Sequence, residues 1–347
     1  MPIIQNLVAD TFGSHIGKYQ GRLKVTQGGK TLAQAPIMHL ERVLVTNKGV
    51  SVSAETIRAC TEKGIPIHFL SGRGTPYASL YSSGLIGTVQ TRRAQLAAFN
   101  QRAGVELALA FVEGKIQNQG NFLKYVAKYR KEKQPEIYKE LHWLAGEIID
   151  HCEEVEALAF TSKQEGQHVD DIRGTLLSIE GRAARKYWAG FKQVLSAELN
   201  WPGRERRGAT DPFNSALNYG YGILYSEIEK AITLAGLDAY AGFIHVDRPG
   251  KPSLVLDMIE EFRTAVVDRT VLGMVNKGTQ IAQDERGFLT DKTRKQLADK
   301  ILTRLEAAAK FEGKRYPLRS IIQMQARHVA TYVRGDRDHY LPFVLSW

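Results

Sequence analysis

The sequence is poor in cysteine and has no long apolar runs. Its 347 residues include two cysteines, Cys60 and Cys152, which form no CxxC motif and no paired metal-ligand spacing. This scarcity argues against a disulfide framework and against structural zinc. No stretch is long enough to cross a bilayer, and residues 1–15 lack the basic start and apolar core of a secretion signal. We therefore expect a cytoplasmic protein without a membrane partner.

A phosphate-binding P-loop is also missing. Residues 28–31 read GGKT, but the first glycine of the motif would have to stand where Lys24 is. Positive charge, in contrast, is in excess. There are 47 Lys and Arg residues against 37 Asp and Glu residues, which gives a net charge of +10 and a pI near 9.4. This balance favours a polyanionic partner, although charge alone does not separate DNA, RNA and a membrane surface.

The hydrophobic pattern changes once along the chain. Up to about Tyr81, short β-branched runs are separated by turn signals, and one helix, over residues 53–63, interrupts them. From about Val89 onward the apolar positions recur with a helical period. We predict an α+β fold, with a small β-rich N-terminal domain over residues 1–87 and a larger all-helical catalytic domain over residues 88–347. The β-rich domain has no acid–base cluster, so we expect it to form a dimer and a scaffold.

Local signals predict several boundaries. Residues 27–30 (QGGK) fit a tight hairpin, and Ser53 can cap the first helix. Asp211 followed by proline marks a helix start, and a further helix begins near Val169. From about Leu289 the tail is predicted to be helical, with Asp291 as the cap of its first helix. The last ten residues, DHYLPFVLSW, are too apolar for a free tail, so we expect them to dock on the body or on a partner.

One predicted helix, beginning near Val169, carries a glutamate beside its apolar stripe. The stripe is formed by Leu176, Ile179, Ala183 and Tyr187, and Glu180 lies next to it. A helical glutamate is most often solvated. Here Gly174 and Gly181 would allow a backbone or a ligand to approach closely, and the following arginines suit phosphate oxygens.

A second stretch, residues 243–263, combines a histidine, a Pro/Gly turn and an acidic helix. Ser253 is expected to cap that helix, so His245 and the acids lie on separate elements. Asp257 and Glu260 are three residues apart and crowd one side of the helix. Solvent or a divalent cation could relieve their repulsion.

Glu180, His245, Asp257 and Glu260 therefore form the candidate catalytic site. Carboxylates and one imidazole suit a hard ion such as Mg²⁺ or Mn²⁺. Such an ion near arginines would support phosphodiester chemistry. Basic side chains that could contact a nucleic acid, or could simply favour solubility, are Arg182, Arg185, Arg204, Arg206, Arg207, Arg248 and Lys251.

Three motifs, taken together, resemble one family. FIHVDRPGKPSLVLDMIEEFR, DPFNSALNYGYGIL and LLSIEGRAARKYW are similar to those of the integrase family of CRISPR spacer acquisition. The resemblance implies a metal-dependent DNA endonuclease and integrase that joins the 3′-hydroxyl ends of a short duplex into a repeat array. It also implies that Glu180, His245 and Glu260 hold the divalent ion, with Asp257 as a supporting acid. The implied assembly is a homodimer with a small ferredoxin-like partner protein.

The match has departures, and alternatives stay open. Ala209 and Thr210 stand where prolines would precede Asp211, and Thr264 stands where a proline often follows. A rotated helix could make Asp257 the inner ligand in place of Glu260. A general metal-dependent nuclease acting on branched DNA or RNA, or a non-catalytic nucleic-acid scaffold, would share most of these features.

Overall fold

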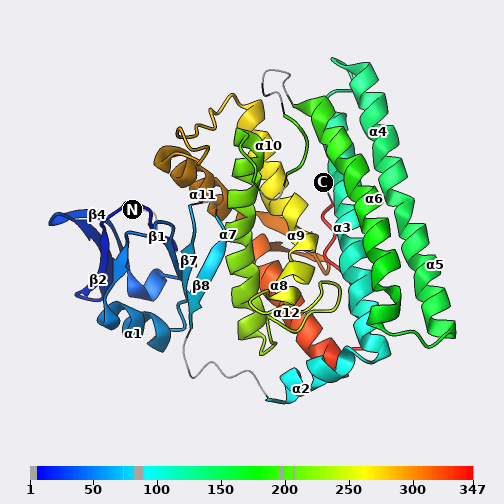
Figure 1. Cartoon of the computed structure of the whole chain (residues 1–347), viewed down its shortest axis with the longest axis horizontal. Coiled ribbons are helices and arrows are strands. Elements are labelled where there is room, and N and C mark those ends of the chain that lie inside the picture. The colour runs from blue at the N-terminus through cyan, green and yellow to red at the C-terminus, as the bar shows by residue number, and fades with distance from the viewer. Residues whose placement is uncertain are drawn as a thin grey trace. The chain divides into compact units, whose positions relative to one another are not determined.

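The computed structural model describes residues 6–72, 74–81, 89–195, 199, 201–205 and 208–346. The predicted linker at residues 82–87 lies outside the described residues, as do Arg206 and Arg207. By its internal contacts the chain divides into two compact units. Unit 1 comprises residues 1–86, 206–226 and 280–303, and unit 2 comprises residues 87–205, 227–279 and 304–347. The α+β fold class is confirmed, because a β-rich N-terminal region precedes a mostly helical part (Figure 1).

Unit 1 contains two four-stranded sheets. In the first, the strand order is β1 (Asn6–Ala9), β5 (Arg42–Val45), β7 (Ile67–Leu70) and β8 (Pro76–Leu80), with the last pair antiparallel. In the second, the order is β4 (Lys30–Pro36), β3 (Arg22–Gln27), β2 (His15–Tyr19) and β6 (Ser51–Val52). A short 3-10 helix covers Ile37–His39. The hairpin predicted at residues 27–30 is confirmed, since Gln27 pairs with Lys30 across the turn.

The predicted helix of the β-rich region is also confirmed. Helix α1 spans Ala54–Glu62, and the Ser53 hydroxyl accepts a hydrogen bond from the backbone N–H of Thr56 at 3.1 Å. Gly64 ends it with a φ of +65°. Apolar side chains from both sheets and α1, including Leu7, Ile16 and Ile67, form one buried core.

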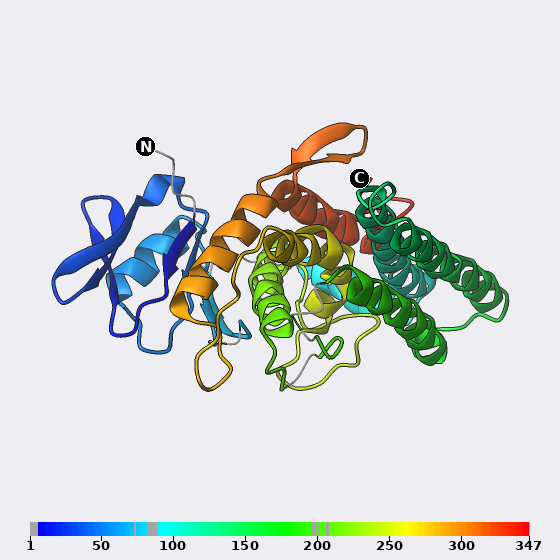
Figure 2. The ribbon, with the colours of Figure 1, turned by 90° about the horizontal axis from the view of Figure 1, so that it is seen from above.

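Long helices dominate unit 2 (Figures 1 and 2). They are α2 (Val89–Ala98), α3 (Arg102–Lys128), α4 (Pro135–Ile149), α5 (His151–Gln164) and α6 (Val169–Val194). Helix α3 packs against α4, α5 and α6. Helix α7 (Pro212–Leu234) starts as predicted, because the Asp211 carboxylate accepts the backbone N–H of Asn214 at 2.8 Å. Its first part belongs to unit 1 and its last turns to unit 2.

The remaining elements follow in order. They are α8 (Ser253–Met258), α9 (Glu260–Arg263), a π-helical turn (Thr264–Asp268), α10 (Arg269–Asn276), α11 (Asp291–Leu305), β9 (Ala308–Phe311), β10 (Lys314–Pro317) and α12 (Leu318–Val333). No helix in the described part of the chain is both long and apolar enough to span a membrane.

Three local predictions were wrong. The predicted helical tail contains the β9–β10 hairpin, because Glu312 and Gly313 both adopt positive φ angles and reverse the chain. Helix α11 is capped by the Thr290 hydroxyl, which accepts the backbone N–H of Thr293, rather than by Asp291. Ser253 is the first residue of α8 and not its cap, since its hydroxyl is used by the preceding loop.

The apolar C-terminal stretch docks on the body, as expected. The Glu261 carboxylate, fully buried on α9, accepts hydrogen bonds from the Tyr340 hydroxyl, the Phe343 backbone N–H and the Gln325 side chain. Asn118 of α3 pairs with the backbone of Phe343 and Leu345 at 2.7 and 2.8 Å. We call residues 340–345 the C-terminal strap. It fixes α9 against α3.

Candidate active site

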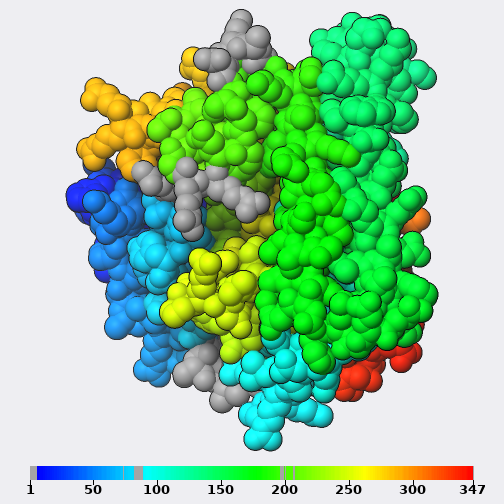
Figure 3. Space-filling model, turned by 45° about the vertical axis from the view of Figure 1, so that its right-hand side comes forward, coloured from blue at the N-terminus to red at the C-terminus, as the bar shows by residue number. Residues whose placement is uncertain are grey.

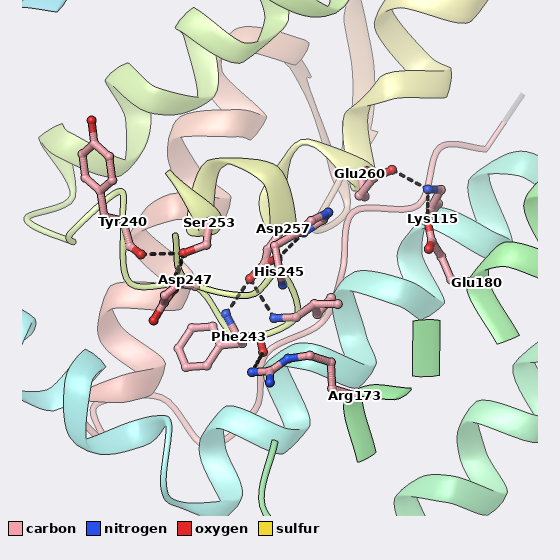
Figure 4. Close-up of polar contacts among 12 residues, drawn as sticks. Lys115, Arg173, Glu180, Tyr240, Phe243, His245, Asp247, Ser253, Asp257 and Glu260 are labelled. Atoms are coloured by element: carbon pink, nitrogen blue, oxygen red, sulfur yellow. Dashed lines mark hydrogen bonds and ion pairs between the residues drawn. The ribbon is translucent and has the colours of Figure 1, made fainter. Parts of the chain in front are cut away.

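Two of the predicted acids meet at a lysine that the sequence analysis did not single out. The Lys115 ammonium, from α3, contacts the Glu180 carboxylate of α6, and its Nζ lies 2.7 Å from Glu260 Oε2 of α9 (Figure 4). The side chains of Lys115, Glu180 and Glu260 are 7%, 17% and 6% exposed. Like charges repel, so two carboxylates this deeply buried require a cation between them. Lys115 supplies one.

Helix α6 places Glu180 through the packing of its apolar stripe. Leu176, Ile179, Ala183 and Tyr187 are all buried, as the spacing predicts. The Tyr187 hydroxyl donates to Asp268 Oδ2 at 2.7 Å, in the π-helical turn that follows α9. This bond ties the helix that carries Glu180 to the segment that carries Glu260.

Glu260 is held in its ionised form by neighbouring cations. Burial by itself would raise the pKa of this carboxyl group. The charges of Arg263, Lys115 and His245 outweigh burial and lower the pKa to about 2. Arg263 Nη2 lies 3.3 Å from Glu260 Oε1. Glu260 is therefore a carboxylate at any physiological pH.

His245 is oriented by Asp257. The Asp257 carboxylate is fully buried and accepts the backbone N–H groups of Phe243, Ile244 and His245 at 2.6 to 3.1 Å. Its Oδ1 also lies 2.7 Å from His245 Nδ1. With Nδ1 engaged, Nε2 is the ring nitrogen left to face a ligand. Asp257 itself has no carboxylate oxygen left for a ligand, because the loop backbone and the imidazole engage both of its oxygens.

Ser253 secures the loop in front of His245. Its hydroxyl accepts the Gly242 backbone N–H at 2.9 Å and lies 2.7 Å from Asp247 Oδ1 (Figure 4). Arg173 of α6 donates to the Phe243 carbonyl oxygen at 3.3 Å. Figure 3 shows α6 (green) beside this loop (yellow) on one face of the molecule. The loop that carries His245 is thus held by both α8 and α6.

The donor atoms at this site are of the kinds that a hard divalent cation prefers. Within the described residues, no three His, Cys, Asp or Glu side chains are arranged closely enough to hold a metal ion. However, Glu260 Oε2 is buried and has no hydrogen-bond partner of good geometry among the described residues, where the Lys115 ammonium is its recorded ion-pair partner. Two carboxylates that share a cation, with an imidazole nitrogen nearby, match the oxygen and nitrogen ligands of Mg²⁺ and Mn²⁺.

The predicted basic residues whose contacts are described interact with other parts of the chain. Arg182 pairs with Glu154 of α5, and Arg204 lies over the Trp188 ring at 5.8 Å. Arg185 is exposed on α6. Arg248 and Lys251 pair with each other through the backbone in the turn before α8.

The two glycines of α6 lie in open space. A Cβ atom added at Gly174 or Gly181 would have no described neighbour within 4 Å. No backbone of another described segment approaches them within this chain. Access for a ligand stays a prediction.

Lys115 carried a recognisable signal in the sequence. It falls on the buried stripe of α3, three residues after Val112 and four before Gln119, in a helix whose neighbouring positions are apolar. A lysine at such a position needs an acidic partner. Arg263 carried a weaker signal, because an arginine three residues after a glutamate is common on exposed helices.

Known proteins match nearly the whole chain. The family model described as CRISPR associated protein Cas1 matches residues 7–302. A CRISPR-associated endonuclease Cas1 of Archaeoglobus fulgidus is 36% identical over 352 residues, covering 98% of this chain and 99% of that protein. One from Thermus thermophilus is 31% identical, covering 96% and 95%.

Solved structures share the fold at lower identity. A Cas1 protein from Thermotoga maritima is similar with a TM-score of 0.75 and 20% identity, covering 97% of this chain and 99% of that one. A casposase bound to integration product is similar with a TM-score of 0.80 and 20% identity, covering 97% and 93%. With its acids, histidine and motifs in this order, the chain belongs to the CRISPR-associated Cas1 family.

Proposed function

We propose that this protein is a divalent-metal-dependent DNA endonuclease and integrase that inserts short DNA duplexes into a CRISPR repeat array. The observation that carries the proposal is the convergence of Glu180 and Glu260, from two different helices, on one cation. His245 is near enough to Glu260 to affect its charge, and its Nδ1 is engaged by Asp257. These contacts support the proposal that the chain's own acids and histidine bind a cation that can also contact a phosphate.

In this proposal Glu180, His245 and Glu260 hold Mg²⁺ or Mn²⁺. When bound, the ion supplies activation of a water or a 3′-hydroxyl and neutralises charge on the reacting phosphate. Asp257 keeps the imidazole in one orientation and one tautomer, so Nε2 carries a lone pair toward the site. Arg263 keeps Glu260 ionised and oriented. The burial of these groups strengthens each of these electrostatic contacts.

The comparisons support the reaction class. The matched relatives are named CRISPR-associated endonucleases, and a structure with the same fold is a casposase bound to integration product. We propose that the protein works in the cytoplasm on a short duplex with 3′-hydroxyl ends and on a repeat array.

We also propose a homodimer that assembles with a small ferredoxin-like partner protein. A solved Cas6-RT-Cas1–Cas2 complex is similar with a TM-score of 0.76 and 20% identity. The β-rich region of unit 1 has no acid–base cluster, which leaves it free for the dimer contact and for scaffolding. Loss of the dimer on removal of residues 1–88 would support this assignment.

Strand transfer tests the proposal directly. A labelled duplex is incubated with a supercoiled plasmid that carries repeats, in Mg²⁺, Mn²⁺ or EDTA, with and without the small partner. Wild type should give joined products only with metal, and Glu180→Gln and His245→Ala should give none. Glu153→Gln, an exposed acid on α5, is the matched control and should behave as wild type.

Two other results would replace the proposal. Cleavage without joining, lost in the same variants, would make the protein a general metal-dependent nuclease on branched DNA or RNA. DNA binding that survives every substitution, with no product in any condition, would make it a non-catalytic scaffold.

A further inference from the structure

Unit 2 contains a second cation-rich feature, separate from the acid cluster. A cavity of about 350 Å³ is lined by four cationic side chains, together with apolar, hydroxyl and aromatic groups, and none of its described lining residues has a carboxylate side chain. Its lining residues come from α3, α10, the end of α11, the β9–β10 hairpin, the last residue of the C-terminal strap and Ser346. Those that matter here are Tyr125, Arg269, Arg304, Lys310 and Arg315. Figure 2 shows the hairpin (orange) projecting beside the C-terminal end.

The hairpin places two of these cations directly opposite each other. Lys310 on β9 and Arg315 on β10 are register partners. Like charges at directly opposed positions destabilise a two-stranded sheet. The hairpin's own acid, Glu312, does not relieve this repulsion, because its carboxylate pairs with Arg337 at 2.9 Å. The like-charge pair therefore costs stability.

Arg304 adds a third, less exposed cation. Its Nε donates to the Ala265 carbonyl oxygen at 2.8 Å, which fixes the guanidinium at the cavity. Burial, with a contribution from the nearby charge of Arg269, lowers the pKa of Arg304 to about 10. In the described part of the chain, no carboxylate forms an ion pair with Arg304, Lys310 or Arg315.

We propose that this cavity binds phosphate groups of a nucleic-acid backbone. Guanidinium groups match phosphate oxygens in two-point contacts, and a lysine adds a mobile point charge. Three cations spread over a cavity of this size suit consecutive backbone phosphates better than one small anion. Tyr125 lies ten residues beyond Lys115 on α3, which places the cavity about 15 Å along the helix from the acid cluster. The site is therefore a holding contact away from the reacting phosphate.

The test is the salt dependence of DNA binding in EDTA, which removes any metal contribution. Fluorescence anisotropy of a labelled duplex is measured between 50 and 200 mM salt for wild type and for Lys310→Ala/Arg315→Ala. Each lost phosphate contact lowers the slope of log K against log salt by about 0.9. The double variant should therefore lose about 2 in slope and bind at least about tenfold more weakly at 100 mM salt.

A matched control separates a site from general charge. Lys131→Ala/Lys133→Ala removes two exposed lysines from the turn between α3 and α4, which do not line the cavity. If the Lys131→Ala/Lys133→Ala control lowers the salt slope less than the hairpin variant does, the proposal is supported. If both variants lower the slope equally, it is overturned. Both variants alter exposed side chains, and a melting temperature no lower than that of wild type confirms their folding.

A second arm distinguishes the source of the phosphate. Inorganic phosphate that raises the melting temperature of wild type but not of the hairpin variant, with equal DNA binding by both proteins, would make this a free-phosphate site and overturn the proposal. The inference rests on the proposed function only for its nucleic-acid partner. If wild type does not bind DNA, the proposed nucleic-acid partner is wrong. If wild type binds DNA and the hairpin variant shows the same salt slope, only the present inference is wrong.

Discussion

Replacing Lys115 by methionine removes the cation that Glu180 and Glu260 share. Methionine has a similar length and no charge, so the change isolates the ammonium. The lysine and Glu260 are 7% and 6% exposed, whereas Glu180 is 17% exposed. Removing one partner of a buried ion pair costs about 3 to 5 kcal/mol, and the partial exposure of Glu180 places this case near the lower end, about 3 kcal/mol.

The assay is thermal unfolding in EDTA, followed by the same measurement with Mn²⁺. A loss of about 3 kcal/mol corresponds to a fall in melting temperature of roughly 6 to 12 °C for a domain of this size. Mn²⁺ should raise the melting temperature of Lys115→Met more than that of wild type, because the carboxylates then share a cation again. Lys139→Met is the control. Lys139 is 69% exposed on α4 and pairs only with the exposed Glu136 among the described ion pairs.

The outcome that would refute this reasoning is simple. If Lys115→Met and wild type have the same melting temperature in EDTA, the ammonium does not hold the two acids together. If Mn²⁺ stabilises wild type but not the variant, Lys115 assists metal binding and does not stand in for the metal.

Three further predictions concern the surroundings of the site. Burial raises the pKa of Glu261 from 4.5 to about 7, so its contribution to stability is present at acid pH and is lost as pH rises through 7. Glu261→Gln has no carboxyl group to titrate and should escape this loss. Its free energy of unfolding, relative to that of wild type, should therefore rise by roughly 2 to 3 kcal/mol between pH 5 and 8 in urea denaturation. Asp257→Asn keeps the shape of the side chain but weakens its grip on the loop and on the imidazole, so kcat for cleavage should fall about 10- to 100-fold while KM for DNA changes less. Gly222→Ala should cost about 2 kcal/mol or more, because its Cβ would lie 1.3 Å from the Gly74 carbonyl oxygen, whereas Gly146→Ala, with open space around it, should be neutral or stabilising in the same denaturation assay.

Local signals predicted local structure well. The Ser53 cap, the Asp211 helix start and the hairpin at residues 27–30 each depend on groups a few residues apart. The buried stripe of α6 likewise follows from its period. The β9–β10 hairpin was missed because it is short and stands between two strongly helical segments. Its turn depends on positive φ at Glu312, which a glutamate rarely adopts.

The site was only partly predictable for a different reason. Glu180, His245, Asp257 and Glu260 were named from motifs, but spacing cannot show which acid is free to face a ligand. The structure favours Glu260, because Asp257 is occupied by three backbone N–H groups and the imidazole. Lys115 is 65 residues from Glu180 in sequence, and its pairing exists only in the folded chain. Contacts of that range leave no periodic trace.

The C-terminal strap has a consequence for the order of synthesis. Glu261 is translated 82 residues before Phe343, whose backbone N–H it accepts. Because the chain emerges N-terminus first, the neighbour of Glu260 stays without its partners until the strap has left the ribosome. The contacts that hold α9 against α3 through the strap therefore form late in synthesis, after every other element they join has been made.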